Sequence, residues 1–409
     1  MEKMVRVKMW IFSLILLILL NPNFDLFLYR KSCRRTLDLS TKRVIREIQD
    51  WGTKVWVDTA KPEDVARASD LGATGGTSNP KLVADAILSD PGKARREITR
   101  LIEKYQSPEF SQRLRRMGEI YNMAGIRYSD NDLLVKMICL ELTGDLIENA
   151  LNNFTGPMSW EVDPRFYNSA EAMVSEAKLI YEIAQERGLD VGRIYIKIPA
   201  TKAGLDAAEK LIREGINVNL TLVFTIAQGL EGLRRYYAAK AESKDNMAKM
   251  CISPFLGRWD DFLKREGVVI EDGNGTPIAG IYFAKLLHQK LLEESGDGER
   301  PEIIMASIRS VHHVQQLIGA DILTIPPKIL FSPEFSTIVA SRPTIGDSID
   351  PELVKRLLQQ GLFAKSMRDI HEGGFTVEEF DGHPLVVEGN DKFIQPYKEL
   401  LDLLVQLMP

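Results

Sequence analysis

The fold is decided by residues 194–224, which read IYIKIPATKAGLDAAEKLIREGINVNLTLVF. Two short runs rich in β-branched residues, 194–199 and 217–224, flank a stretch in which apolar residues recur every three or four positions. Gly215 is typical of the residue that ends such a helical stretch. Because both runs are mostly apolar, they read as strands buried on both faces. The segment therefore predicts a strand–helix–strand unit of a parallel sheet.

The same alternation of an apolar run and a helical stretch occurs along most of the chain. The runs lie at residues 54–58, 73–79, 159–162, 194–199, 217–224, 250–255, 302–308 and 322–325. Eight alternations favour an α/β protein with a (β/α)8 TIM barrel over an open doubly wound sheet. The chain also lacks the GxGxxG and GxxxxGKS or GxxxxGKT loops with which open sheets bind nucleotides.

The composition is that of an ordinary globular protein. The 409 residues include 52 lysines and arginines against 57 aspartates and glutamates, a formal net charge of −5, with 44% apolar and 27% charged residues. Mild acidity argues against nucleic acid as a partner, since binding it requires a concentrated basic face. The three cysteines, Cys33, Cys139 and Cys251, suit a reducing compartment such as the cytoplasm. The five histidines form no zinc-binding pattern, so we expect no metal.

The amino terminus differs from the rest of the chain. Residues 9–20 read MWIFSLILLILL and have lysines and arginines on both sides. This run is shorter than the roughly 20 apolar residues that span a bilayer. Three hypotheses stay open for residues 1–38: a leader outside the catalytic fold, a membrane anchor and an organelle-targeting segment. A membrane is an expected partner only if the leader is an anchor.

The remainder, residues 39–409, is expected to be a single barrel domain with additional helices. Residues 88–156 are mostly helical and charged in pattern, which predicts a helical insertion outside the barrel. Residues 333–409 read as further helices, including 351–360 and 393–408, and we expect them to close against the barrel.

Polar residues gather where such barrels keep their active sites, at the carboxyl ends of the strands. Ten residues from seven strands, or from the loops directly after them, meet this criterion: Asp58, Asn79, Glu161, Lys197, Asn219, Thr221, Ser253, Arg258, Ser307 and Arg309. Their convergence is more informative than any single residue and predicts one catalytic site at this end of the barrel.

Lys197 is the strongest candidate for catalysis, because isoleucines flank it in IYIKIP. Burial removes the hydration of a lysine, which favours the neutral amine that attacks a ketone or aldehyde to form a Schiff base. Asp58 and Glu161 would supply carboxylates for the proton transfers of that reaction. The alternatives are a lysine that extends to water, an Asp58 that caps the next helix and a Glu161 that pairs with Arg165.

Two arginines and a serine near the strand ends suggest a phosphate clamp. The guanidinium groups of Arg258 and Arg309 and the hydroxyl of Ser307 are suitable donors to phosphate oxygens. Alone, each arginine is more typical of a solvated ion pair. Asn79 and Asn219 would bind sugar hydroxyls or stabilise their own turns, and Pro80 makes the turn more typical for Asn79.

Several motifs together resemble the transaldolase family. They are DTAKPEDV at 58–65, GGTSNPKLV at 75–83, YIKIPATKAG at 195–204, GINVNLTLVF at 215–224, ISPFLGRWDD at 252–261 and MASIRSVHHVQQLIGADILTIPPKIL at 305–330. The match runs in order from about residue 37 to the carboxyl end. The resemblance implies a class I aldolase barrel of circularly permuted type that needs no metal or cofactor and carries its lysine on the fourth strand. The strand count above places Lys197 on the fourth strand as well.

Carried over by position, the resemblance implies a role for each candidate. Lys197 would form the Schiff base, and Asp58 would act on the C4 hydroxyl of the substrate. Glu161 and Thr221 would orient and activate the catalytic water. The remaining residues form a set that contacts the sugar and a set that binds its phosphate: Asn79, Asn219, Ser253 and Phe255, and Arg258, Ser307 and Arg309, respectively.

The implied reaction moves a dihydroxyacetone unit from sedoheptulose 7-phosphate to glyceraldehyde 3-phosphate. It yields erythrose 4-phosphate and fructose 6-phosphate in the non-oxidative pentose phosphate pathway, so phosphorylated sugars are the expected partners, with a homodimer left open. The sister fructose-6-phosphate aldolases resemble the chain less, since they carry glutamine and tyrosine in place of Glu161 and Phe255. The rival hypotheses are a simple aldolase, a barrel with a dead site and a membrane-attached scaffold that rests on residues 9–20 alone.

Overall fold

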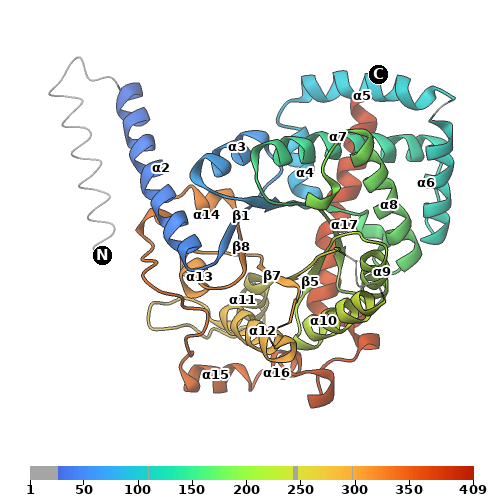
Figure 1. Cartoon of the computed structure of the whole chain (residues 1–409). Coiled ribbons are helices and arrows are strands. Elements are labelled where there is room, and N and C mark those ends of the chain that lie inside the picture. The colour runs from blue at the N-terminus through green and yellow to red at the C-terminus, as the bar shows by residue number, and fades with distance from the viewer. Residues whose placement is uncertain (1–25, 109, 243–246, 297) are drawn as a thin grey trace.

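The strands of the computed structural model close into one barrel. The structure describes residues 26–108, 110–242, 247–296 and 298–409. Within these residues, eight parallel strands pair in chain order from β1 to β8, and β8 pairs back with β1. The predicted (β/α)8 barrel is therefore confirmed, with helices surrounding it (Figure 1).

The strands lie where the sequence predicts them, although several are shorter. They are β1 Lys54–Asp58, β2 Gly75–Thr77, β3 Met158–Glu161, β4 Ile194–Pro199, β5 Val218–Val223, β6 Met250–Pro254, β7 Glu302–Met305 and β8 Ile322–Ile325. The seventh run was expected to reach residue 308. It ends at Met305, two residues before Ser307, whose left-handed backbone (φ 62°) departs from the extended conformation of a strand.

Helices connect the strands and cover the outside of the barrel. The α-helices are α2 Leu26–Asp50, α3 Pro62–Leu71, α4 Pro80–Ile87, α5 Pro91–Gln106, α6 Ser111–Met123, α7 Asp130–Asn153, α8 Ala170–Glu186, α9 Lys202–Arg213, α10 Ile226–Ala241, α11 Leu256–Arg265, α12 Ala279–Ser295, α13 Val311–Gln316, α14 Pro327–Leu330, α15 Pro351–Leu357, α16 Gly361–Ser366 and α17 Pro384–Leu407. The 3₁₀ turns are η1 Pro164–Phe166, η2 Val191–Arg193, η3 Phe335–Thr337, η4 Ile370–Glu372 and η5 Val377–Gly382. Pro62 begins α3, Gly72 ends it and Ser169 caps α8.

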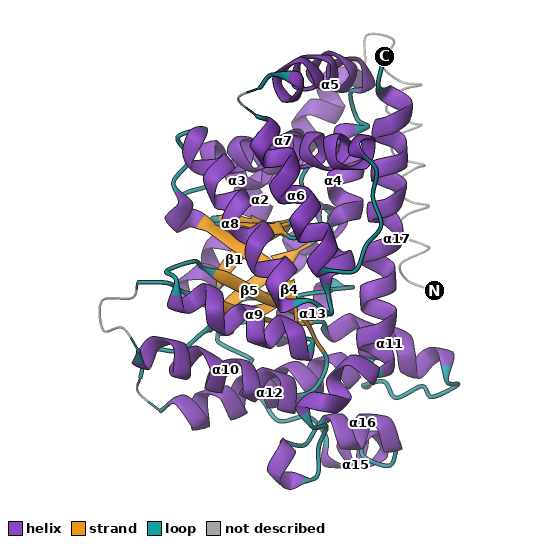
Figure 2. Cartoon of the chain, turned by 90° about the vertical axis from the view of Figure 1, so that its right-hand side faces the viewer, coloured by secondary structure: helices purple, strands orange, loops and turns teal. Residues whose placement is uncertain are grey.

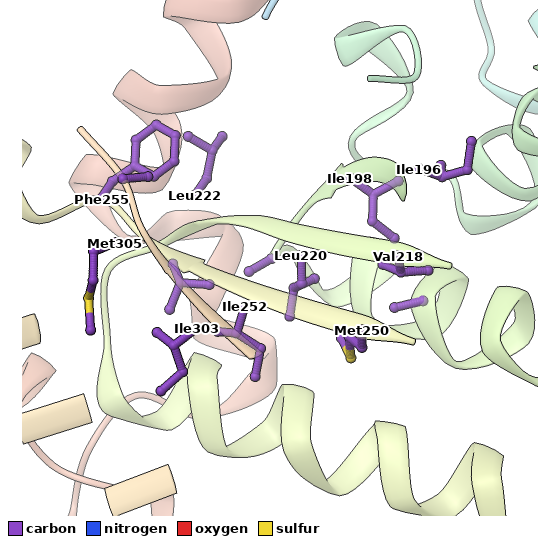
Figure 3. Close-up of a cluster of buried hydrophobic side chains, with 14 of the residues drawn as sticks. Ile196, Ile198, Val218, Leu220, Leu222, Met250, Ile252, Phe255, Ile303 and Met305 are labelled. Atoms are coloured by element: carbon purple, nitrogen blue, oxygen red, sulfur yellow. The ribbon is translucent and has the colours of Figure 1, made fainter. Parts of the chain in front are cut away.

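The apolar side chains of the strands form two separate layers, because successive residues of a strand point to opposite faces. The outward layer packs beneath the helices, and Figure 3 shows part of it, including Ile196 and Ile198 of β4 and Leu220 of β5. The inward layer fills the base of the barrel with Trp56, Tyr195, Cys251, Ile304 and Ile322. The barrel is thus a packed core, and only its carboxyl end is left for a site.

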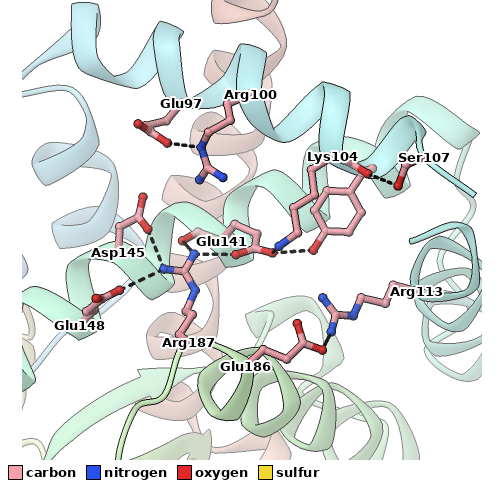
Figure 4. A network of polar contacts seen from close by, with 11 residues as sticks. Glu97, Arg100, Lys104, Ser107, Arg113, Glu141, Asp145, Glu148, Glu186 and Arg187 are labelled. Atoms are coloured by element: carbon pink, nitrogen blue, oxygen red, sulfur yellow. Dashed lines mark hydrogen bonds and ion pairs between the residues drawn. The ribbon is translucent and has the colours of Figure 1, made fainter. Parts of the chain in front are cut away.

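Residues 88–156, for which the sequence predicts a helical insertion, contain helices α5, α6 and α7. Glu141 of α7 is buried and accepts hydrogen bonds from Lys104 at 2.5 Å, Tyr105 at 2.7 Å and Arg187 at 2.5 Å (Figure 4). Burial alone raises the pKa of Glu141, but these three donors together lower it below its ordinary value. The carboxylate therefore stays charged and ties α5 and α7 to the end of α8.

The first described helix crosses the expected boundary of the leader. Helix α2 runs without interruption through residue 38, and Asp38 accepts a hydrogen bond from Arg67 of α3 at 2.7 Å. Further along α2, Val44, Ile45 and Ile48 are fully buried. The apolar stretch 9–20 lies outside the described residues, so the three leader hypotheses stay open. In the part of the chain that the structure describes, no helix has the length and apolar character to cross a membrane.

The carboxyl-terminal helix α17 begins at Pro384 rather than at residue 393. The sequence Gly-Asn-Asp at 389–391 is typical of a turn, yet here it lies inside the helix. Helix α17 packs against α4, α7 and β5, and Figure 2 shows it running along one side of the barrel with its carboxyl end beside α5. This course brings residues distant in sequence next to the barrel.

Candidate active site

The barrel interior changes from apolar to polar toward the carboxyl ends of the strands. Trp56 of β1 and Tyr195 of β4 belong to the apolar inward layer. Two residues further along these strands, on the same face, lie Asp58 and Lys197. The polar layer therefore lies at the end of the barrel where the sequence analysis expected the site.

Lys197 is buried within this layer, with 4% of its surface exposed. The strand register places Glu161 of β3 on one side of it and Asn219 of β5 on the other. Its Nζ donates to Glu161 Oε2 at 2.9 Å and to the backbone carbonyl of Ser78 at 2.8 Å. The lysine thus points into the barrel and does not extend to water.

Asp58 and Glu161 provide two carboxyl groups close to the lysine. Asp58 accepts a hydrogen bond from Thr77 Oγ1 at 2.8 Å, and it does not cap α3, whose N-cap residue is Lys61. Burial raises the pKa of both Asp58 and Glu161, and the charge of Lys197 offsets this only in part. The raised pKa values of both carboxyl groups lie closer to neutral pH, and a general acid or base is most effective when its pKa is near the working pH.

Arg165, the alternative partner of Glu161, is engaged elsewhere. Its Nε donates to Asp163 Oδ1 at 2.9 Å and its Nη2 to Asp163 Oδ2 at 2.6 Å. Nη2 also donates to the hydroxyl of Tyr121 at 2.6 Å. The ion pair of Glu161 is therefore with Lys197.

An amide and two hydroxyls form a hydrogen-bonded chain across β3, β5 and β6. Asn219 Nδ2 donates to Ser159 Oγ at 3.0 Å, and Asn219 Oδ1 accepts from Ser253 Oγ at 2.7 Å. Thr221, two residues further along β5, is fully buried, and its Oγ1 has no partner among the described residues. Buried polar groups are rarely left unpaired, so this hydroxyl marks a position for a water or a substrate oxygen.

Asn79 caps its own helix and also faces the site. Its Oδ1 accepts a hydrogen bond from Leu82 N at 3.1 Å, and this bond makes Asn79 the N-cap residue of α4. Asn79 therefore stabilises its own turn, which is one of the two roles that the sequence left open for it. The side chain nevertheless lines the cavity with the other candidates, where its amide N–H groups remain as donors.

Arg258, Ser307 and Arg309 come together because α11 begins against the chain that follows β7. Gly257 N donates to Ser307 O at 3.2 Å, and a Cβ at residue 257 would lie 2.3 Å from that oxygen, so glycine is required there. Arg309 is exposed and pairs with Asp261 at 3.3 Å. Among the described residues, Arg258 Nη1 and Ser307 Oγ have no hydrogen-bond partner.

The two arginines also influence each other electrostatically. The pKa of Arg258 is lowered mainly by burial and, to a smaller extent, by the positive charge of Arg309. Two guanidinium groups that repel each other beside unpaired donors form a suitable site for a dianion such as a phosphate monoester.

One cavity of about 110 Å³ connects these residues. Its lining includes every predicted site residue except Glu161, which contacts Lys197 instead. The cavity adjoins a wider groove of about 920 Å³ and shares Asn79, Arg258 and Phe393 with it. The structure thus places ten of the eleven predicted residues around one cavity, and their roles stay predictions.

Four residues that line the cavity were not predicted: Thr77, Ala306, Thr324 and Phe393. Thr324 lies two residues after the inward-facing Ile322 and near the carboxyl end of β8, so the criterion that identified Lys197, a polar residue near the end of an apolar strand, could also have identified Thr324. Phe393 comes from α17, and its ring centroid lies 4.7 Å from Lys197 Nζ. No local sequence pattern predicts that contact.

Comparisons with known proteins show which family the chain resembles. Residues 55–372 match the family model described as Transaldolase/Fructose-6-phosphate aldolase. A Transaldolase of Chlamydia pneumoniae is 29% identical over 308 residues, which cover 73% of this chain and 78% of the relative. Transaldolases of Baumannia cicadellinicola subsp. Homalodisca coagulata and of Prochlorococcus marinus (strain MIT 9211) are both 34% identical, over 176 and 181 residues. These two alignments cover 43% and 44% of this chain and about half of each relative, 50% and 48%.

Proposed function

The chain belongs to the transaldolase/fructose-6-phosphate aldolase family, and we propose that its activity is that of a transaldolase. One observation carries the proposal, the contact between the buried amine of Lys197 and the carboxylate of Glu161. A carboxylate accepts the proton of the amine and passes it to water, which the glutamine expected in the sister aldolases cannot do. The names of the relatives support the same activity.

In the first half of the reaction, the lysine takes apart the donor sugar. Lys197 gives a proton to Glu161 and attacks the C2 carbonyl of sedoheptulose 7-phosphate. Water leaves the resulting carbinolamine with help from Glu161 and from the hydroxyl of Thr221. Asp58 then removes the proton of the C4 hydroxyl, the C3–C4 bond breaks, and erythrose 4-phosphate departs. The raised pKa of Asp58 supports this role, since a stronger base accepts the proton more readily.

In the second half, the three-carbon enamine on Lys197 adds to the acceptor. Its C3 forms a bond to the aldehyde carbon of glyceraldehyde 3-phosphate, and Asp58 returns its proton to the new hydroxyl. Hydrolysis of the imine, with Glu161 activating the water, releases fructose 6-phosphate. Arg258, Ser307 and Arg309 hold the phosphate of the donor and then that of the acceptor.

The proposal includes a setting for the reaction. Phosphorylated sugars are the small-molecule partners, and no metal or cofactor takes part. We place the enzyme in the cytoplasm, a reducing compartment in which the unpaired thiols of Cys139 and Cys251 persist. A homodimer stays a prediction.

Trapping the intermediate tests the proposal. Sodium borohydride added with fructose 6-phosphate should reduce the Schiff base, and mass spectrometry should locate a three-carbon adduct on Lys197. Lys197→Arg should abolish the adduct, because arginine stays protonated and forms no imine. Lys202→Arg, which changes an exposed lysine of α9, should retain it. An adduct on another lysine would overturn the assignment.

The products distinguish transfer from simple cleavage. With sedoheptulose 7-phosphate and glyceraldehyde 3-phosphate present, fructose 6-phosphate should exceed free dihydroxyacetone. The reverse result would favour the simple aldolase. No turnover and no adduct would favour a barrel with a dead site.

A further inference from the structure

The face of α17 that turns toward the barrel carries Gly389, Phe393 and Tyr397. A spacing of four residues places all three on one side of the helix. Phe393 and Tyr397 are each only 6% exposed, although α17 lies outside the strands. The helix therefore presents a buried aromatic face to the catalytic end of the barrel.

Phe393 covers the reacting amine. Its ring centroid lies 4.7 Å from Lys197 Nζ, while Glu161 Oε2 and the Ser78 carbonyl occupy other sides of the same nitrogen. The ring of Phe255 approaches that of Phe393 edge-on at 6.3 Å. An aromatic face attracts a cation and at the same time keeps water from it. The ring would therefore both attract a protonated imine at this nitrogen and shield it from water.

Tyr397, one turn further along α17, holds the helix in place. Its hydroxyl accepts a hydrogen bond from Lys136 Nζ of α7 at 2.5 Å. Lys136 is itself fully buried and forms ion pairs with Asp163, at 3.4 Å, and with Glu176 of α8. Because Asp163 follows Glu161 by two residues, the same buried cluster holds both α17 and the end of β3.

Side-chain contacts matter here because the backbone of α17 is weakened near Phe393. Pro396 lacks an N–H group, so the carbonyl of residue 392 loses its helical hydrogen bond. On the other side of Phe393, α17 approaches β5 closely, since a Cβ on Gly389 would lie 3.0 Å from Leu222 Cδ2. The position of the ring is thus set by contacts one turn before it and one turn after it.

We infer that Phe393 is a specificity-determining residue that favours transfer over hydrolysis by covering the Schiff base, and that Tyr397 is the positioning residue that holds it there. The inference rests on the proposed transaldolase function. Helix α17 would thus help to determine whether the enzyme forms fructose 6-phosphate or free dihydroxyacetone.

The two fates of the enamine explain the effect. In transfer, C3 attacks the acceptor aldehyde and forms a carbon–carbon bond. In hydrolysis, a proton from solvent adds to C3, water adds to C2 of the resulting imine, and the C2–nitrogen bond breaks. Free dihydroxyacetone and the Lys197 amine are then formed. The proton added to C3 stays in dihydroxyacetone, the attacking water gives a proton back to solvent, and one water is consumed overall. The proton that adds to C3 comes from bulk solvent, so a cover that keeps solvent from the enamine suppresses this branch. The water that later releases fructose 6-phosphate is the one that Glu161 activates.

The test measures free dihydroxyacetone against fructose 6-phosphate at saturating glyceraldehyde 3-phosphate. Phe393→Leu removes the aromatic face and keeps an apolar cover, whereas Phe393→Ala removes both. We expect the ratio to rise about 2- to 30-fold, the range that a cation–π contact is worth, with Phe393→Ala showing the larger rise. Tyr397→Phe keeps the ring and loses the bond to Lys136, so the ratio should rise less.

A matched control separates this role from general stability. Phe335→Leu changes a fully buried phenylalanine that does not line the cavity, and it should leave the ratio unchanged. An unchanged ratio in Phe393→Leu and Tyr397→Phe, with the wild type transferring normally, would overturn the inference and leave the proposed function intact. If the wild type makes no fructose 6-phosphate, the proposed function itself fails. Should Phe393→Ala not fold, the two conservative variants decide.

Discussion

At the scale of single residues, the site contains polar and charged groups whose burial is costly. Burial raises the pKa values of Asp58 and Glu161. Within the described chain, Thr221 Oγ1, Arg258 Nη1 and Ser307 Oγ have no hydrogen-bond partner. Each such group costs free energy when buried, and a bound substrate that pairs with it recovers that cost as affinity. Stability and activity are therefore opposed at these positions.

Asp58→Asn is expected to stabilise the protein at neutral pH while abolishing cleavage. The pKa of Asp58 in the folded protein lies above its ordinary value of 3.8, so ionising it costs more in the folded state than in the unfolded one. Well below pH 3.8 both states are protonated and the variant has no advantage. The advantage grows as the pH rises from there through the folded pKa and is constant above it. Urea unfolding at pH 4 and pH 7 should show a gain of up to about 2 kcal/mol at the higher pH.

The control for this prediction is Asp70→Asn, on the exposed side of α3. It should leave the free energy of unfolding nearly unchanged at both pH values. A loss of stability in Asp58→Asn at pH 7 would mean that the bond from Thr77 and the charge of Lys197 outweigh burial.

Glu161→Gln is expected to slow formation and hydrolysis of the imine. A neutral amide cannot take the proton of the Lys197 amine or activate water, and loss of a general base costs about 10² to 10⁴ in rate. Rapid mixing followed by borohydride trapping measures imine formation at neutral pH. Glu171→Gln, which changes an exposed carboxylate paired with Lys210, is the matched control. Equal rates in the wild type and Glu161→Gln would leave Glu161 without a catalytic role.

At the scale of elements, strand positions follow from composition, but strand ends do not. The runs 54–58, 194–199 and 322–325 match β1, β4 and β8 to the residue, because strands covered on both faces are mostly apolar and stand out from the segments around them. Where a strand ends depends on backbone geometry that side-chain patterns do not report. The positive φ of Ser307, two residues after β7, is an example, and the positive φ of Leu222 coincides with the irregular register near the end of β5.

In the site, too, some residues could be predicted from the sequence and others could not. Residues such as Asp58 and Lys197 were predictable, because the carboxyl ends of all barrel strands meet in one place. Phe393 was not, because its place depends on how a helix distant in sequence packs on the finished barrel. The contact of Lys197 with Ser78 was also beyond prediction, since a backbone carbonyl carries no residue-specific signal.

Gly257→Ala is expected to weaken phosphate binding by moving an element rather than by removing a donor. A Cβ at this position would lie 2.3 Å from Ser307 O and 2.5 Å from Arg309 Cγ, so α11 must shift away from the phosphate site. Fructose 6-phosphate should lose more affinity than unphosphorylated fructose. Arg258→Ala should show the same discrimination, about 10- to 150-fold, because a charge-assisted bond is worth about 1.5–3 kcal/mol.

Measured KM values for the two sugars check this prediction. Gly361→Ala, at a glycine whose added Cβ meets no atom within 4 Å, should affect neither sugar. Equal losses for both sugars in Gly257→Ala and Arg258→Ala would show that this side of the cavity does not bind phosphate.

At the scale of the whole molecule, the described amino-terminal helix belongs to the core from about Asp38 onward. Val44, Ile45 and Ile48 are fully buried, and Trp51 Nε1 donates to the carbonyl of Ala340 at 2.8 Å. The expected leader boundary at residue 38 thus falls inside α2 and not at its end. We therefore expect residues 38–50 of α2 to be part of the folded barrel domain, whatever residues 1–37 do.

Truncation tests this division of the chain. A protein that starts at residue 38 keeps the three buried side chains and the Asp38–Arg67 pair, so its midpoint of thermal unfolding should match that of the full chain. A protein that starts at residue 51 loses all three side chains. Each large-to-small change in a core costs about 2–5 kcal/mol, and a whole domain is stable by only about 5–15 kcal/mol, so this protein should not fold. A protein that starts at residue 26 is the control for removing the first part of the leader. If the chain from residue 51 unfolds at the same temperature as the full chain, α2 is dispensable and the core of the barrel begins at β1.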